Sequence, residues 1–284
     1  MANVLNTTKK VAVITALVEG CSVNSTVRMT GVAKTTILRL LEEVGTACAE
    51  FQDAAIRNVA SKRVQVDEIW SFCYAKDKNA TPEMWERVGF AGDVWTFTAI
   101  DADSKLVLSW LCGRRDAGCA AQFLEDVAAR LSNRIQLTTD GHRMYLDAVP
   151  EAFGDDIDYA QLVKVYGNDP EGHKRYSPAQ CLGTKRIGVS GDPDRAHIST
   201  SYVERQNLNM RMGMRRFTRL TNGFSKKIDN HMHQVALFYM WYNFGRVHMT
   251  LKSTPAMAAG ISSHTWSVEE IVGLSFVQTA TVAA

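Results

Sequence analysis

The chain has 284 residues, of which 46% are hydrophobic and 22% charged, so it has room for a full domain and a smaller companion, and disorder, collagen and coiled coil are excluded. No uncharged apolar stretch is long enough to cross a bilayer, and Lys9, Lys10 and Glu19 interrupt the N-terminal apolar run, so neither membrane association nor a signal peptide is expected. The net charge is +2, but residues 195–252 hold ten Lys and Arg against two acids, a local charge of +8 that predicts a polyanionic partner.

The first sixty residues predict a helix-turn-helix domain. Apolar residues recur at helical spacing around Gly20, which ends one helix, and Gly31, which supplies a tight turn. A short helix, a Gly turn and a helix that begins with Lys and Thr are typical of DNA-reading modules. We therefore expect Lys34, Thr36 and Arg39 to contact DNA, with a plain three-helix cap as the alternative. The expected helices are 11–18, 23–29 and 32–43.

Beyond residue 61 the pattern predicts an α/β domain. The order βββαβαβα is that of a ribonuclease-H-like fold of the retroviral-integrase type, whose mixed sheet has its first and fourth strands side by side. We expect this domain to span 61–250, with a long, partly irregular insertion at about 166–199, and a C-terminal extension over 251–284. The expected strands are 64–70, 94–100, 106–111, 135–139 and 159–165, and the expected helices are 116–131, 144–153, one from Ser201 onward and 227–244.

Three acids stand out by their position. Asp67 interrupts a mostly apolar strand, where a carboxylate is costly unless a cation binds it. Asp140 ends the fourth strand, so adjacent first and fourth strands would bring these two carboxylates together, and Glu204 begins the basic helix. Such oxygen ligands suit two Mg²⁺ ions about 4 Å apart, with Mn²⁺ as a substitute, which activate a water or a 3′-hydroxyl for phosphoryl transfer.

Each acid also has a structural alternative. Asp67 fits an ion pair with Lys or Arg, and Asp140 fits a turn former. Ser201-x-x-Glu204 fits a capping box, in which the glutamate folds back onto the start of its helix. Glu68 points to the opposite face of its strand and is expected to be a surface acid.

Four blocks of sequence resemble those of bacterial DDE transposases, most closely the insertion-sequence-one family. They are 65–70 (QVDEIW), 137–142 (LTTDGH), 199–207 (STSYVERQN) and 242–248 (YNFGRVH). The resemblance implies a metal-binding catalytic triad of Asp67, Asp140 and Glu204, with Arg211 as the basic residue seven positions after the glutamate. The chain departs from the family pattern in the long gap between Asp140 and Glu204 and in having no N-terminal zinc finger.

The helix from Ser201 is expected to carry a stripe of arginines. Arg211, Arg215 and Arg219 would share one helical face at spacing four, with Arg205 beside them. Such a stripe typically contacts DNA phosphates and positions the duplex without reading its sequence. A solvated helix face is the alternative.

These patterns together predict a transposase that cleaves and joins DNA at insertion-sequence ends. Its partner would be double-stranded DNA, and it would act as at least a homodimer, because two ends have to be held together. We expect it to be cytoplasmic and nucleoid-associated, with no membrane contact. A DNA-binding regulator or a decayed transposase relative that binds terminal repeats without cutting is the alternative, and a ribonuclease or junction nuclease on the same fold is a third.

Overall fold

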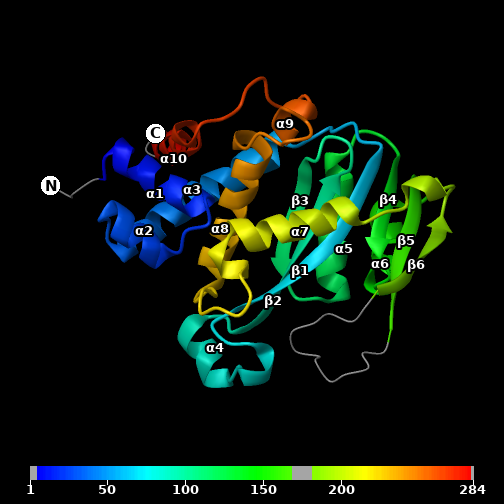
Figure 1. Ribbon diagram of the computed structural model, residues 1–284, viewed down its shortest axis with the longest axis horizontal. Helices are drawn as coiled ribbons and strands as arrows, with labels where there is room; N and C mark the ends of the chain where they lie inside the picture. The colour runs from blue at the N-terminus through cyan, green and yellow to red at the C-terminus, as the bar shows by residue number, and fades with distance from the viewer. Residues whose placement is uncertain (1–4, 168–180, 283–284) are drawn as a thin grey trace.

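A six-stranded mixed sheet forms the centre of the computed structural model, which describes residues 5–167 and 181–282 (Figure 1). The strand order is β3-β2-β1-β4-β5-β6, and β1 pairs antiparallel with β2 and parallel with β4. The predicted α/β class and the adjacency of the first and fourth strands are confirmed, and this order is compatible with a ribonuclease-H-like fold. The strands are β1 (Arg63–Cys73), β2 (Gly92–Asp101), β3 (Val107–Gly113), β4 (Ile135–Asp140), β5 (Ile157–Tyr166) and β6 (Cys181–Ser190).

Helices cover both faces of this sheet. They are α1 (Thr7–Val18), α2 (Val23–Thr30), α3 (Lys34–Ala55), α4 (Pro82–Val88), α5 (Ala117–Arg130), α6 (Met144–Phe153), α7 (Ser201–Gly213), α8 (Ile228–Met240), α9 (Pro255–Ala258) and α10 (Val268–Val282). Phe97 of β2 points to one face and packs against α5, while Thr98 points to the other and hydrogen-bonds Tyr239 of α8 at 2.7 Å. In β1, Glu68 lies opposite Phe97 and Asp67 lies opposite Thr98. Glu68 therefore starts on the face that packs against α5, and Asp67 on the face of α8. Among the described residues, no helix combines the length and apolar character that a membrane span requires.

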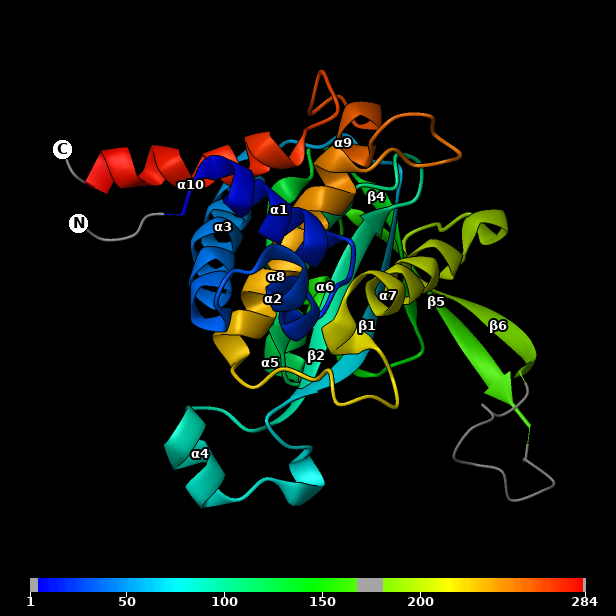
Figure 2. The ribbon, with the colours of Figure 1, turned by 60° about the vertical axis from the view of Figure 1, so that its left-hand side comes forward.

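The N-terminal helices pack against the rest of the chain. Gly31, at φ 70°, makes the predicted turn between α2 and α3. α3 then runs for 22 residues, well beyond the expected end at residue 43, because its second half lies along α8. Gln52 of α3 donates its side-chain N–H to the Ala236 carbonyl oxygen of α8 at 3.1 Å. α10 packs against α1 and α3, so the first and last helices are neighbours (Figure 2).

The close approach of α3 and α8 requires Gly45. A Cβ added there would lie 2.6 Å from the Cβ of His233 and 2.8 Å from its backbone. Gly45→Ala is therefore expected to lower the melting temperature, because forcing two packed helices apart costs about 1–3 kcal/mol, more than the roughly 1 kcal/mol that alanine contributes to helix propensity. Gly118→Ala on α5 is the matched control, since a Cβ there meets its nearest neighbour at 3.7 Å. Equal melting temperatures for both variants would contradict the packing described.

Two segments are more regular than the sequence indicated. Within the expected, partly irregular insertion, residues 181–190 form β6 and pair antiparallel with β5; residues 168–180 lie outside the described part of the chain. Every residue of β6 is exposed, so no buried face imposes the alternation from which a strand is predicted. α4 was also not predicted, although Thr81 caps its start and Gly89 ends it in the left-handed conformation.

The helix expected over 227–244 is α8 followed by a π-helical turn, Trp241–Gly245. Asn243 in this turn is buried and pairs with the backbone of Val107 on β3, donating to its oxygen and accepting from its N–H, both at 3.0 Å. Tyr242 donates its hydroxyl hydrogen to the Lys105 carbonyl oxygen at 3.1 Å. The start of the fourth sequence block, 242–248, therefore ties the end of α8 to the sheet.

Candidate active site

Asp67 and Asp140 lie next to each other where β1 and β4 end their pairing. The last paired residues of these parallel strands are Gln65 and Thr138, and each aspartate follows two positions later on its strand. With a side-chain period of two, each aspartate points to the same face as the paired residue before it. Ligand oxygens of Asp67, Glu68 and Asp140 all lie within 4.8 Å of one another. The predicted pairing of the first two acids is therefore present.

Glu204 faces the same cavity from the first turn of α7. The Gln65 side-chain oxygen of β1 accepts hydrogen bonds from the backbone N–H groups of Tyr202 and Val203 at 2.8 and 3.2 Å, which fixes the start of α7 over the sheet. Asp67, Asp140 and Glu204 line one cavity of about 440 Å³. Three separate elements thus bring their carboxylates to a single concave site.

Glu204 does not cap its own helix. Thr200 occupies the N-cap position, and the Ser201 N–H that a capping box would place on Glu204 donates instead to the Ser199 hydroxyl at 3.2 Å. The Glu204 carboxylate accepts a hydrogen bond from the Thr200 hydroxyl and forms an ion pair with Lys164, whose Nζ lies 2.6 Å from Oε2. The capping-box alternative is therefore wrong, and the carboxylate is directed to the cavity side of the helix.

The expectation that Glu68 is a surface acid is wrong. Its position in the register puts it on the opposite face of β1 from Asp67, as predicted, but α5 and α6 pack on that face, its side chain is 0% exposed, and its carboxylate still comes within 4.8 Å of that of Asp67. Arg115 donates from Nε at 2.5 Å, and the Tyr145 hydroxyl donates at 2.8 Å. The Arg115 guanidinium also lies 3.7 Å from Asp140, so it joins the buried glutamate to the acidic pair.

The carboxylates of Asp67, Glu68 and Asp140 repel one another, so an added cation would stabilise the cluster. Burial, followed by the negative charges of Glu68 and Asp140, raises the pKa of Asp67 to about 7. Burial and the charge of Asp140 also raise the pKa of Glu68, although Arg115 opposes this shift. Asn207, on α7, donates to Asp67 at 2.9 Å and holds its orientation. Carboxylate oxygens that repel one another beside an open cavity are the donor set that Mg²⁺ or Mn²⁺ prefers, so the residues present fit a divalent cation.

The raised pKa of Asp67 predicts a pH-dependent stability in the presence of EDTA. Its folded-state pKa of about 7 exceeds its ordinary value of 3.8, so folding favours the protonated form, and the stability that this provides is lost as pH rises from about 4 to 7. Asp67→Asn removes the charge and keeps the shape. At pH 8 we expect this variant to be more stable than the wild type by up to about 4 kcal/mol, with the difference vanishing near pH 4. Denaturant unfolding at both pH values measures it, and equal stability at pH 8 would contradict the repulsion described.

The predicted arginine stripe is not a helical face. α7 ends at Gly213, and Arg215 begins a separate 3₁₀ turn, Arg215–Phe217. Met214 and Phe217 are buried in one hydrophobic cluster, and their burial, rather than helical spacing, sets the backbone there. Arg211 lies in the last turn of α7, and Arg219 lies beyond both elements.

The N-terminal residues predicted to contact DNA lie at the start of α3. Lys34 and Arg39 are exposed, whereas Thr36 is only partly exposed. Arg39 forms an ion pair with Glu43, one turn along the helix, at 3.6 Å. The role of these residues in DNA binding, and that of Arg205, stays a prediction.

Comparison with known proteins gives distant structural likenesses only. No family model and no curated protein matches the chain. The Mos1 transposase paired-end complex with left transposon end is 13% identical at a TM-score of 0.25, and the match covers 56% of this chain and 60% of that one. The piggyBac transposase synaptic complex with hairpin DNA is 11% identical at a TM-score of 0.39, covering 97% and 70%. The Mos1 strand transfer complex is 12% identical at 0.24, covering 84% and 77%. Likenesses this low carry no weight for function.

Proposed function

We propose that the chain is a DDE transposase that cleaves DNA at the ends of an insertion sequence and joins the freed 3′-hydroxyls to target DNA. The observation that carries this proposal is the meeting of Asp67, Asp140 and Glu204, from three elements, around one cavity. The resemblance of the sequence to the insertion-sequence-one family assigns its catalytic triad to the same three residues. The proposed cofactors are two Mg²⁺ ions, with Mn²⁺ as a substitute.

The three carboxylates would hold the divalent cations, and neighbouring residues set their geometry. The chemistry supplied at these carboxylates would be metal-assisted: a lower pKa for a water or a 3′-hydroxyl, and stabilisation of the leaving oxygen of an in-line phosphoryl transfer. Asn207 fixes the orientation of Asp67 through its 2.9 Å hydrogen bond. Gln65 holds the start of α7, and with it Glu204, over the sheet. Asp140 is fixed through the hydrogen bond that its carboxylate accepts from the His142 N–H at 2.9 Å.

Double-stranded DNA is the proposed partner, bound as element ends and as target. Lys34, Thr36 and Arg39 would contact the ends, and the basic segment 195–252 would contact phosphates. Two ends have to be brought together for joining, so we propose that at least a dimer assembles on DNA, in association with the nucleoid. The proposed domains are 1–60 for end recognition, 61–250 for catalysis and 251–284 as an extension.

Metal-dependent cleavage of end DNA tests this proposal. Labelled duplexes taken from the DNA that borders the coding sequence would be incubated with the purified chain in Mg²⁺, in Mn²⁺ or in EDTA. We expect strand breaks that leave 3′-hydroxyls in either metal and none in EDTA. End-specific binding without breaks in either metal would overturn the proposal.

Glu204→Gln separates catalysis from a structural role. The substitution removes the charge but keeps the shape, and it breaks the partly exposed ion pair with Lys164, which is worth about 0–1 kcal/mol. The melting temperature is therefore expected to change little, while strand cleavage falls by several orders of magnitude. Glu125→Gln, on the exposed face of α5, is the control for loss of one negative charge. Full cleavage activity in Glu204→Gln would remove this residue from the site.

One contact favours the second candidate, a DNA-binding regulator or decayed relative that binds ends without cutting. Lys164 pairs with Glu204 at 2.6 Å, and a permanent ion pair there would keep the third carboxylate from a cation. Lys164→Gln distinguishes the two functions. In a transposase the wild type and Lys164→Gln both cleave in Mg²⁺, whereas in a protein held inactive by this ion pair the wild type does not cleave and Lys164→Gln gains cleavage.

A further inference from the structure

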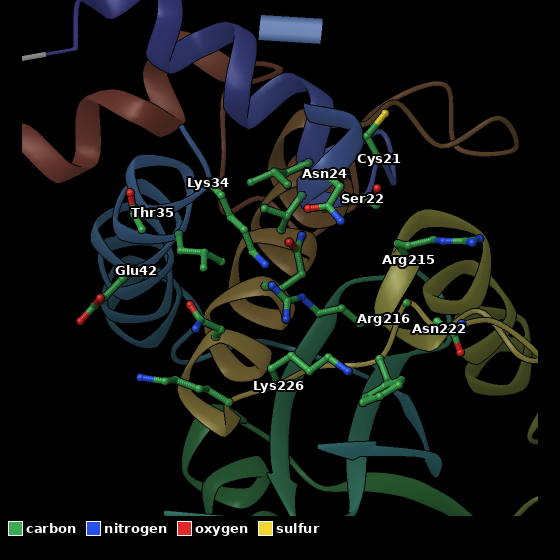
Figure 3. A pocket seen from close by; sticks show the side chains of 18 of the residues that line it. Cys21, Ser22, Asn24, Lys34, Thr35, Glu42, Arg215, Arg216, Asn222 and Lys226 are labelled. Atoms are coloured by element: carbon green, nitrogen blue, oxygen red, sulfur yellow. The ribbon is translucent and has the colours of Figure 1, made fainter. Parts of the chain in front are cut away.

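A second cavity, of about 620 Å³, opens between the N-terminal helices and the segment that follows α7 (Figure 3). One wall is the face of α3 that carries Lys34, Thr35 and Leu38, with the start of α2 beside it. The opposite wall comes from residues 215–227 and from α8. Six basic residues line it, with Glu42 as the one acid among the lining residues: Lys34, Arg39, Arg215, Arg216, Lys226 and Lys227.

Three of these cations converge without a compensating acid. In Figure 3 the side chains of Lys34, Arg216 and Lys226 extend from different elements into the cavity. Within the described part of the chain, none of the three lies within 4.0 Å of a carboxylate oxygen. Arg216 donates to the neutral Ser225 hydroxyl at 3.1 Å. Burial, and then repulsion from Lys34, lower the pKa of Lys226, and burial lowers that of Arg216 to about 10. Like charges held together in this way are stabilised by an added anion.

The first turn of α3 adds to this preference for an anion. Its N-cap residue is Ala33, which makes no side-chain capping hydrogen bond. The N-terminus of a 22-residue helix carries a partial positive charge and free N–H donors. Phosphate groups bind readily at such ends.

The cavity fits a phosphate of a DNA backbone rather than a stacked base. Its aromatic residue, Phe224, is already covered, because Phe72 stacks on it at 4.6 Å between ring centroids and the Lys226 Nζ lies 3.1 Å from its ring centroid. Base stacking, which single-strand binders use, is therefore blocked. Ser22, Asn24 and Asn222 add neutral polar groups to the walls, and together with the cations these are the groups that contact phosphates.

The position of the cavity relative to the acidic site favours DNA over a small anion. α7 carries Glu204 near its start and ends at Gly213, two residues before Arg215 of the cavity wall. Nine residues of helix span about 14 Å, or roughly four base pairs of duplex. A single duplex is long enough to reach both places.

We propose that this cavity is a groove that seats the phosphodiester backbone of duplex DNA, built jointly by the start of α3 and the segment after α7. The inference rests on the proposed function for the identity of the polyanion. It joins Lys34, predicted to read element ends, and Arg215, predicted to contact phosphates, in one binding site. The N-terminal helices and the segment after α7 would then contact the same DNA backbone.

The test measures DNA binding in EDTA, where no cleavage takes place. Affinity for a labelled random-sequence duplex would be followed against salt for the wild type and for Lys34→Gln, Lys226→Gln and the double variant. These side chains are exposed, so the variants are expected to fold. We expect weaker binding of every duplex sequence and a slope of log K against log salt that falls by about 0.9 for each lost phosphate contact. Lys62→Gln, an exposed lysine outside the cavity, is expected to leave the slope unchanged.

Three outcomes decide between the possibilities. An unchanged salt slope in the double variant overturns the groove. ATP and pyrophosphate binding would be measured on the same proteins. If the double variant loses the binding of either anion but keeps the duplex affinity of the wild type, the cavity is a small-anion pocket and the groove is overturned as well. A lowered slope in a protein that never cleaves end DNA in Mg²⁺ would support the groove and refute the proposed transposase activity, so the two failures are distinguishable.

Discussion

Asp67→Asn and Asp140→Asn are each expected to abolish metal-dependent strand cleavage, by about a thousandfold or more, while the protein still folds and binds end DNA. The two carboxylates belong to the group whose ligand oxygens lie within 4.8 Å of one another. Each substitution therefore removes one of the two negative charges of Asp67 and Asp140. The amide keeps the size and the hydrogen-bonding shape of the carboxylate. Single-turnover cleavage of labelled end DNA measures the effect.

Two comparisons make this result specific to the site. Glu125→Gln removes one acid from the exposed surface of α5 and is expected to cleave at the wild-type rate. DNA affinity in EDTA should be unchanged or slightly increased in both aspartate variants, because they lose negative charge near a bound polyanion. Cleavage within a few fold of wild type in Asp140→Asn would mean that the carboxylate pair is structural.

Arg115→Gln is expected to lower the free energy of unfolding by about 3 kcal/mol, because it leaves a buried carboxylate without its cation. The Glu68 side chain is 0% exposed, while that of Arg115 is 32% exposed, so water reaches the pair from one side only. Tyr145 would be the remaining donor to Glu68. Denaturant unfolding at neutral pH measures the loss.

Adding Glu68→Gln to Arg115→Gln tests the cause of that loss. The double variant holds no buried charge at this position, so it is expected to recover most of the stability that Arg115→Gln loses. Additive destabilisation in the double variant would show that Arg115 acts through packing on Trp95, whose ring centroid lies 4.5 Å from its guanidinium carbon.

The sequence predicted those parts of the fold that a repeating pattern or a turn residue determines. Val64, Val66 and Ile69 make β1 a mostly apolar run and are buried, so the central strand was predictable from its composition. Gly31 has a positive φ where the turn was expected. The pairing of Asp67 with Asp140 followed from the order of the strands, since only adjacent first and fourth strands bring the two positions together.

Other features depend on contacts between distant residues and could not be predicted in this way. The alternation along β1 correctly placed Glu68 on the opposite face of the strand from Asp67, but it gave no indication that Arg115 and Tyr145 would bind its carboxylate in a buried position within 4.8 Å of that of Asp67. Helical spacing from Ser201 extended α7 too far, because the burial of Met214 ends the helix. The place of Gln65 beside the site was predictable, since Gln65 lies two positions before Asp67 and shares its face of the strand.

Manganese binding to the protein without DNA tests the central claim most directly, since the claim is that Asp67 and Asp140 form a divalent-cation site. Free Mn²⁺ would be followed by electron paramagnetic resonance at pH 8, above the pKa of about 7 of Asp67. The wild type and Glu125→Gln are expected to bind Mn²⁺ equally, with affinity falling as pH drops through 7, because protons compete for the carboxylate. Asp140→Asn is expected to bind more than about tenfold more weakly. Equal Mn²⁺ affinity in Asp140→Asn and the wild type, or no Mn²⁺ binding by the wild type at pH 8, would contradict the claim.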